Sequence, residues 1–258
     1  MIDSHAHILS EYYENIDKLV EELKNNKVIN VLNCSTSYEE AKEIIELSKN
    51  FNGFFLPAIG IHPENVENNN IDEIENIIKS NKVYALGEIG LDYHYRKDNK
   101  EQQKELFIKQ LDLALKYDLP VVVHTRESIQ DCYDILKEKK VRGVIHCFSG
   151  SYEMACNFIK LGFKLGIGGV LTFKNSKLGE VIEKLDLKDI LLETDSPFLS
   201  PEPLRGKKNN PSNIYYVAKK ISEIKNIDVD TVITQTTSNF IHYFDIWNCI
   251  LYNFNMRR

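Results

Sequence analysis

The chain has 258 residues, of which 43% are hydrophobic and 27% charged, and its formal net charge is −6. This composition is typical of a globular enzyme with a substantial core, and the acidic balance argues against a protein that coats nucleic acid nonspecifically. No apolar run approaches the length of a membrane span, and the N-terminus lacks the features of a signal peptide. The five cysteines form no Cys-x-x-Cys pair, so we expect a reduced, cytoplasmic protein.

Strand-like and helix-like segments alternate along the whole chain. Short apolar runs predict strands at residues 2–7, 28–33, 54–60, 83–90, 120–124, 143–146, 163–169 and 190–195. Apolar residues at helical spacing predict helices at residues 15–26, 37–49, 71–78, 99–117, 128–139, 152–161, 176–185, 211–224 and 229–244. Ser37 and Glu40 have the spacing of a capping box at the start of the second of these helices.

This alternation predicts a single (β/α)8 TIM barrel over residues 1–258, because no linker rich in Pro, Gly or Ser divides the chain. The alternative is an open, doubly wound sheet. It lacks support, because no G-x-G-x-x-G or G-x-x-x-x-G-K-[ST] motif follows a predicted strand. Residues 68–70 are three asparagines and indicate a loop tip, and the pattern does not place the tail after Trp247.

Two histidines end the first predicted strand. His5 and His7 are two residues apart, so their side chains point to the same side of the strand. Two neutral imidazoles that converge form half of a site for a divalent metal. Chance placement on a half-exposed strand explains such a pair equally well, so the interpretation depends on further ligands.

Further polar residues follow the apolar runs of other strands, at Glu88, His124, His146 and Asp195. In a barrel the active site lies at the carboxyl ends of the strands, so these side chains are expected to meet. Each has an ordinary alternative, such as a hydrogen-bonded histidine or an aspartate that caps a turn. Their occurrence at matching positions on several strands favours a metal centre.

Four histidines and two carboxylates provide enough ligands for two divalent ions, with positions left for water and substrate. Two such ions, about 3.5–4 Å apart, clamp the attacking and leaving oxygens and lower the pKa of bound water. We expect Glu88 to bridge the ions, and Asp195 to act as a ligand and as the general base. Glu193, on the same predicted face as Asp195 and one pleat deeper, is expected to support the site without binding metal.

Six segments carry or adjoin these residues: 5–7 (HAH), 87–93 (GEIGLDY), 123–127 (VHTRE), 146–150 (HCFSG), 193–197 (ETDSP) and 205–209 (RGKKN). In this order they resemble the motifs of the TatD family of metal-dependent hydrolases, and the resemblance extends from residue 1 to about residue 244. It implies an amidohydrolase-type TIM barrel with two divalent cations that hydrolyses DNA, in several members as a Mg²⁺-dependent 3′→5′ exonuclease. The metal ligands that it implies are His5, His7, Glu88, His124, His146 and Asp195.

Two positions near the site depart from the family pattern. Asn210 stands where the family often has Glu, and Glu64 stands where a second His is common. His62 and Tyr93 lie at predicted strand ends and are expected to contact a phosphate or stack on a base. An ordinary structural role for His62 in its Ile-His-Pro turn is the alternative.

A basic segment follows the last predicted strand. Arg205 and the lysines at 207 and 208 lie close to where barrels commonly hold phosphate, so Arg205 is a candidate substrate-binding residue. Two cations and an arginine suit an anionic phosphodiester better than a neutral amide. A solvated surface loop is the alternative.

We therefore expect a metal-dependent deoxyribonuclease that acts on single-stranded DNA or 3′ ends, away from membranes and without an obligate protein partner. The main alternative is a hydrolase of esters or amides, such as a D-aminoacyl-tRNA deacylase. Many amidohydrolases bridge their metals with a modified lysine on strand four, where this chain has Glu88. The complete ligand set argues against a non-enzymatic scaffold. Four imidazoles favour Zn²⁺, Mn²⁺ or Fe²⁺, whereas the family resemblance implies Mg²⁺.

Overall fold

The computed structural model describes residues 1–68 and 71–247. Its eight strands form one parallel sheet in which each strand pairs with the next along the chain. The strands are β1 (Ile2–Ala6), β2 (Asn30–Cys34), β3 (Phe55–Ile59), β4 (Ala85–Asp92), β5 (Val121–Arg126), β6 (Gly143–Ile145), β7 (Lys164–Ile167) and β8 (Ile190–Leu192). This order is the one that a (β/α)8 barrel requires.

Backbone hydrogen bonds close the sheet between β1 and the segment that follows β8. The Asp195 N–H donates to the His5 carbonyl at 2.9 Å, and the His7 N–H donates to the Ser196 carbonyl at 2.7 Å. Ala6 and Ser196 form a parallel bridge between these bonds. The predicted barrel is thereby confirmed.

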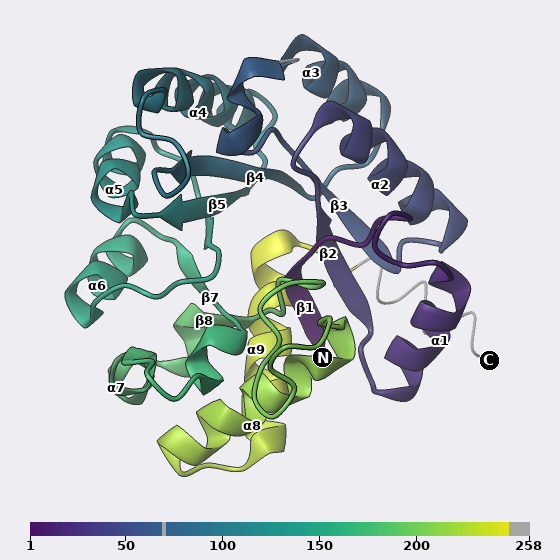
Figure 1. The fold of residues 1–258 in the computed structure, drawn as a ribbon, viewed down its shortest axis with the longest axis vertical. Coiled ribbons are helices and arrows are strands. Elements are labelled where there is room, and N and C mark those ends of the chain that lie inside the picture. The colour runs from purple at the N-terminus through teal and green to yellow at the C-terminus, as the bar shows by residue number, and fades with distance from the viewer. Residues whose placement is uncertain (69–70, 248–258) are drawn as a thin grey trace.

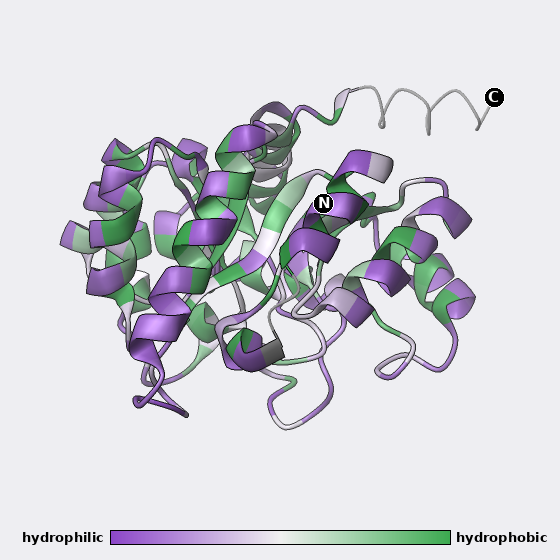
Figure 2. Cartoon of the chain, turned by 90° about the horizontal axis from the view of Figure 1, so that it is seen from above, coloured by the Kyte–Doolittle hydropathy of each residue, from purple (hydrophilic) through white to green (hydrophobic). Residues whose placement is uncertain are grey.

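Helices α1 to α8 each follow the strand of the same number, and α9 comes last. Their bounds are α1 (Ile16–Asn25), α2 (Tyr38–Asn50), α3 (Ile71–Ser80), α4 (Lys100–Lys116), α5 (Ile129–Glu138), α6 (Tyr152–Lys160), α7 (Leu178–Lys184), α8 (Ile214–Lys225) and α9 (Val229–Phe244). Short 3-10 turns occupy residues 63–68, 169–172, 187–189 and 211–213. Figure 1 shows the helices around the strands, and Figure 2 shows their hydrophilic sides turned outward.

The predicted cap at Ser37 forms, with one difference from a capping box. The Ser37 hydroxyl accepts the Glu40 N–H at 3.3 Å, as expected for a helix N-terminus. The Glu40 carboxylate bonds the Thr36 N–H at 2.6 Å, one residue earlier than the motif requires. The bond ties the end of β2 to α2 beside the carboxyl ends of the strands.

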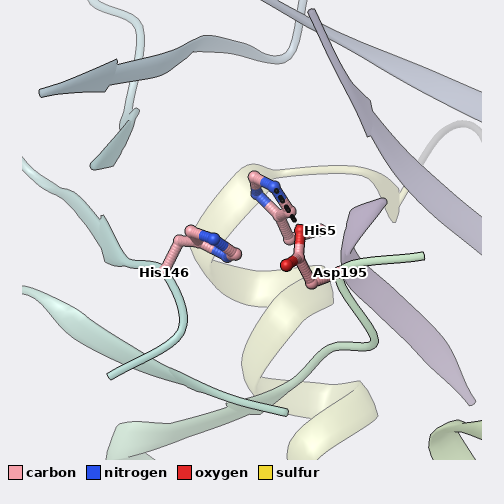
Figure 3. Close-up of side chains that lie close together, drawn as sticks. All are labelled: His5, His146 and Asp195. Carbon is pink, nitrogen blue, oxygen red and sulfur yellow. Dashed lines mark ion pairs between the residues drawn. The ribbon is translucent and has the colours of Figure 1, made fainter. Parts of the chain in front are cut away.

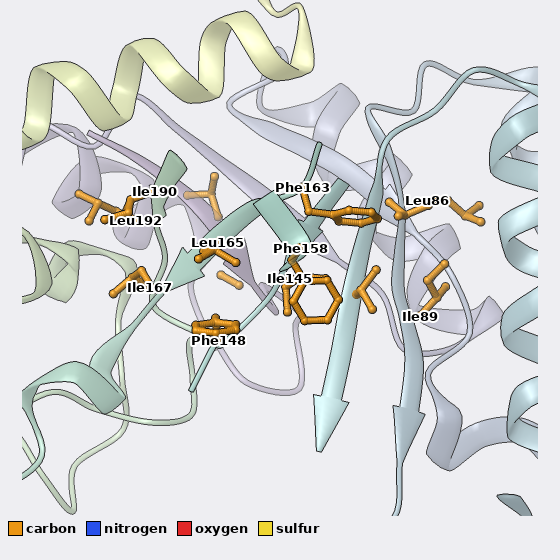
Figure 4. Close-up of a cluster of buried hydrophobic side chains, with 14 of the residues drawn as sticks. Leu86, Ile89, Ile145, Phe148, Phe158, Phe163, Leu165, Ile167, Ile190 and Leu192 are labelled. Atoms are coloured by element: carbon orange, nitrogen blue, oxygen red, sulfur yellow. The ribbon is translucent and has the colours of Figure 1, made fainter. Parts of the chain in front are cut away.

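The strands are buried on both faces, which explains their continuous apolar runs. In β5, Val121 and Val123 pack in the larger cluster between strands and helices, whereas Val122 belongs to the smaller cluster. Figure 4 shows part of the larger cluster, with residues of β4, β6, β7 and β8 together with Phe158 of α6. Phe240 and Phe244 of α9 complete the smaller cluster.

Helix α9 is fixed to the amino ends of the strands, opposite the predicted site. The Tyr243 hydroxyl bonds both the N–H and the carbonyl of Gly143, at 2.8 and 2.9 Å, where β6 begins. The Asn239 amide donates to the Ile190 carbonyl at 2.9 Å, where β8 begins. None of the helices in the described ranges is long and apolar enough to span a membrane.

Two strand boundaries differ from the predicted ones in ways that affect the site. Strand β4 continues two residues further, to Asp92, whereas β8 ends at Leu192. Asp195 lies beyond β8 with a φ of 56°, so the pleated alternation used to compare it with Glu193 does not extend that far. The loop tip predicted at residues 68–70 lies partly, and the tail at 248–258 wholly, outside the described residues.

Candidate metal centre

All six predicted ligands meet at the carboxyl ends of the strands. They come from β1 and the residue after it, from β4 and β5, and from the segments that follow β6 and β8: His5, His7, Glu88, His124, His146 and Asp195. Figure 3 shows His5, His146 and Asp195 converging from three of these elements. The rings of His5 and His146 stack with their centroids 3.6 Å apart. The closed barrel therefore brings residues 5 and 195 into contact.

One group of ligand atoms surrounds a single point. His5 Nε2 and His7 Nε2 are 3.1 Å apart, and each lies 3.4 Å from Glu88 Oε2. Asp195 Oδ1 lies 3.6 Å from both imidazole nitrogens. Ligands about 2.1 Å from one ion are separated by about 3.0 Å in octahedral and about 3.4 Å in tetrahedral geometry. His5, His7 and Glu88 thus form one candidate group for a divalent cation, and His5, His146 and Asp195 form another.

A second group surrounds the other oxygen of the same carboxylate. Glu88 Oε1 lies 2.8 Å from His124 Nδ1, 3.6 Å from His146 Nε2 and 3.8 Å from His62 Nε2. The ring centroids of His62 and His124 are 4.5 Å apart. His62, predicted to bind substrate, thus lies within the ligand cluster itself. The two oxygens of Glu88 face two different sets of nitrogens, as a bridging carboxylate would.

Contacts behind the histidines orient their rings. His7 Nδ1 lies 2.9 Å from the Cys34 carbonyl, which can only accept, so Nδ1 carries the hydrogen and Nε2 keeps its lone pair. His146 Nδ1 lies 3.1 Å from Glu193 Oε1. The Cys34 carbonyl thus fixes the tautomer of His7, and the Glu193 carboxylate lies against the Nδ1 edge of His146. The predicted supporting place of Glu193 agrees with this contact.

Two glycines leave space for the side chain of Glu193. The residue is fully buried, and its Oε1 accepts the Cys147 N–H at 2.7 Å. A Cβ on Gly166 would lie 2.1 Å from Glu193 Oε2, and a Cβ on Gly168 would lie 3.4 Å from its Cγ. Only glycine at position 166 therefore leaves room for this side chain.

Asp92 belongs to the site and is not among the residues predicted from the sequence. Its Oδ2 lies 3.0 Å from His124 Nε2, while Oδ1 accepts the His94 N–H at 2.8 Å. His124 is thereby held between Asp92 and Glu88. The signal was present in the Gly-Leu-Asp-Tyr run, but the predicted strand ended at residue 90, before Asp92.

The charges in the cluster reinforce one another. Burial opposes ionisation of Glu88, but the neighbouring His5 and His146 outweigh it and hold the pKa of the carboxyl well below its usual range. Burial also lowers the pKa of His124, but hydrogen bonds with Asp92 and Glu88 outweigh it and raise that pKa to about 9. The carboxylates are therefore ionised and available as ligands at neutral pH.

A cavity of about 640 Å³ opens over the cluster. Among the described residues that line it, Arg126 is the only arginine or lysine. Two predicted substrate-binding residues do not line it. The Tyr93 hydroxyl donates to Asp131 at 2.8 Å, and the Arg205 guanidinium lies 3.8 Å from the centroid of the Phe173 ring. Their contacts with substrate stay predictions.

A (β/α)8 barrel with this ring of histidines and carboxylates is the architecture of a metal-dependent hydrolase. Residues 2–245 match the family model described as TatD related DNase, and the chain belongs to this family. The predicted resemblance is thereby confirmed.

Individual relatives agree with this assignment. The chain is 37% identical to the uncharacterized metal-dependent hydrolase YabD of Bacillus subtilis, over 95% of this chain and 99% of the relative. It is 31% identical to human deoxyribonuclease TATDN3, over 95% and 94% of the two chains. The crystal structure of YJJV, a TatD homolog from Escherichia coli, matches with a TM-score of 0.89 and 29% identity, over 95% and 98%.

Proposed function

We propose that the chain is a deoxyribonuclease that uses two divalent ions to hydrolyse phosphodiester bonds, releasing nucleotides from the 3′ end of single-stranded DNA. The observation that carries this proposal is the position of Glu88, with Oε2 3.4 Å from His5 Nε2 and His7 Nε2, and Oε1 2.8 Å from His124 Nδ1. Two ions held by these groups would act as Lewis acids on the phosphoryl oxygens and lower the pKa of water.

Asp195 is the proposed general base. Its carboxylate is 14% exposed and lines the cavity, so it is accessible to a water molecule that attacks the substrate. Burial raises the pKa of Asp195, but the neighbouring His7 and His146 outweigh it and lower the pKa below its usual value. The ionised carboxylate can therefore accept the proton that the water loses.

Arg126 and the two proposed divalent ions would favour an anionic substrate over a neutral one. Arg126 lines the cavity, and its guanidinium can bind a phosphate through two parallel hydrogen bonds. Arg205 lies in the connection between β8 and α8, where we place a more distant phosphate of the strand. The name of the human relative, a deoxyribonuclease, supports DNA as the substrate.

The test is hydrolysis of 5′-labelled single-stranded DNA by the wild type and by Asp195→Ala, with Mg²⁺, Mn²⁺ or EDTA. We expect a ladder that shortens from the 3′ end, lost in EDTA and in the variant. Asp134→Ala, an exposed aspartate on α5, is the matched control and should keep wild-type activity. Thermal melting of each variant establishes that it is folded.

Failure of wild-type protein to cleave any DNA with any of these metals would refute the proposal. Esters would then be tested, beginning with D-aminoacyl-tRNA. Cleavage that persists in Asp195→Ala would retain the deoxyribonuclease and reject the assignment of the general base.

A further inference from the structure

Two aromatic side chains at the mouth of the cavity are exposed to solvent. Phe198 is 48% exposed and Tyr95 is 66% exposed, and both line the cavity over the metal cluster. Covering a large aromatic ring is energetically favourable, and at a binding site the ring offers a flat surface for another ring. Because they lie beside a cluster of charged groups, they suit a ligand with both a charged and an aromatic part.

Phe198 adjoins the first group of ligands. Its N–H donates to the Asp195 carbonyl at 2.7 Å, which fixes it three residues after that ligand. The centroid of its ring is 6.0 Å from that of His7 and 5.8 Å from that of Tyr12, both in T-shaped arrangements. The ring is thus held in place beside the ligands while about half of its surface stays open.

Tyr95 lies on the other side of the mouth. It belongs to the connection between β4 and α4, whereas Phe198 belongs to the connection between β8 and α8. In a closed barrel of eight strands, β4 and β8 are diametrically opposed. The Arg126 guanidinium lies 4.8 Å from the centroid of the Tyr95 ring, a cation–π distance. The charge that suits a phosphate and the surface that suits a base are therefore adjacent.

We propose that Phe198 and Tyr95 are stacking surfaces for unpaired nucleobases on the two sides of the scissile phosphate. This inference rests on the proposed function and names its substrate class: a strand end whose bases are free to leave the stack. The face of any base can stack on an aromatic ring, so these contacts recognise bases without reading their sequence. A base that remains paired in a duplex cannot present its face to either ring.

The cavity dimensions agree with this substrate class. A volume of about 640 Å³ lies within the roughly 300–1,000 Å³ typical of sites for small ligands. Four of the six predicted ligands are buried, and His124 and Asp195 are partly exposed, so a phosphate that reaches them would have its flanking bases turned toward the walls. Single-stranded ends can do this without breaking base pairs.

The experiment compares a short oligothymidylate with the same strand carrying abasic tetrahydrofuran residues at its 3′ end. The enzymes are the wild type, Phe198→Ala, Phe198→Trp, Tyr95→Ala and the control Tyr215→Ala. Tyr215 is 43% exposed on α8 and does not line the cavity in the described part of the chain. A strand with 2-aminopurine at the 3′ end, bound in the presence of Ca²⁺, reports stacking through its fluorescence.

We expect Phe198→Ala to raise KM for the base-bearing strand about 5- to 150-fold, the equivalent of about 1–3 kcal/mol per stacked base. For the abasic strand, Phe198→Ala and the wild type should have the same KM. Phe198→Trp should keep the low KM of the wild type for the base-bearing strand and should still quench 2-aminopurine. Tyr95→Ala should show the same selectivity, and Tyr215→Ala should match the wild type.

The inference would be overturned if Phe198→Ala and Tyr95→Ala each raised KM equally for the base-bearing and the abasic strand, or raised it for neither. The proposed deoxyribonuclease activity would still stand. An unchanged quench of 2-aminopurine in both alanine variants would overturn it independently of turnover. Wild-type protein that neither binds nor cleaves any of the strands would refute the proposed function and this inference together.

Discussion

Removing the carboxylate of Glu193 should weaken metal binding although Glu193 is not a predicted ligand. Its Oε1 accepts the Cys147 N–H at 2.7 Å and lies 3.1 Å from His146 Nδ1. In Glu193→Ala the buried N–H loses its acceptor, and His146 loses the carboxylate that lies against its Nδ1. Partners of this kind typically contribute 10- to 100-fold to metal affinity.

The expected loss of metal-binding free energy is about 1.4–2.7 kcal/mol, because each factor of ten corresponds to about 1.4 kcal/mol. The unpaired N–H should lower the free energy of unfolding by about 1–3 kcal/mol. Glu193→Gln keeps an oxygen acceptor and loses only the charge, so a decrease in affinity of less than about tenfold is expected.

Gly166→Ala tests the same contact without altering the carboxylate. Its Cβ would lie 2.1 Å from Glu193 Oε2, so the side chain must move. Gly179→Ala is the matched control, because its Cβ would meet the nearest atom, Ile224 Cδ1, at an ordinary 3.6 Å.

Isothermal titration of metal-free protein with Mn²⁺ measures the affinities, and urea unfolding measures the stabilities. The reasoning would be refuted by wild-type affinity for Mn²⁺ in both Glu193→Ala and Gly166→Ala. Lower stability with unchanged affinity would show that Glu193 serves the fold alone.

Four further outcomes are expected. Glu88→Ala should leave a folded protein that binds at most one ion per chain, because the two groups of ligand atoms share this carboxylate. Elemental mass spectrometry measures the number of ions bound. When the free metal concentration is 100 times Kd, removing the metal with a chelator should lower the Tm of the wild type by about 5–10 °C, the equivalent of about 2.7 kcal/mol. Gly90→Ala should destabilise by about 1–3 kcal/mol or more in urea, because its φ is 144° and its Cβ would lie 2.2 Å from the His124 carbonyl oxygen. Phe107→Ala, fully buried on α4, should lower the free energy of unfolding by about 3–5 kcal/mol.

Much of this protein is determined by local sequence pattern. A strand buried on both faces must be apolar throughout, so the runs that end in His124 and His146 mark both the strands and their carboxyl ends. Parallel strands in a closed barrel present these ends at one mouth. The fold and the six residues of the predicted ligand set could therefore be proposed from the chain, although Glu88 lies inside β4 and Asp195 lies three residues beyond β8.

Other features depend on distances between residues far apart in the sequence, which only the closed sheet sets. The contact of Asp92 with His124 requires the register of β4 on β5, in which Asp92 pairs with Arg126. The placement of Glu193 against Gly166 likewise requires the pairing of β7 with β8. Tyr93 and Arg205 do not line the cavity, because the orientation of a side chain after a strand depends on the turn that follows. Hydrophobic pattern specifies which face of an element is buried, whereas the barrel geometry decides which polar atoms meet.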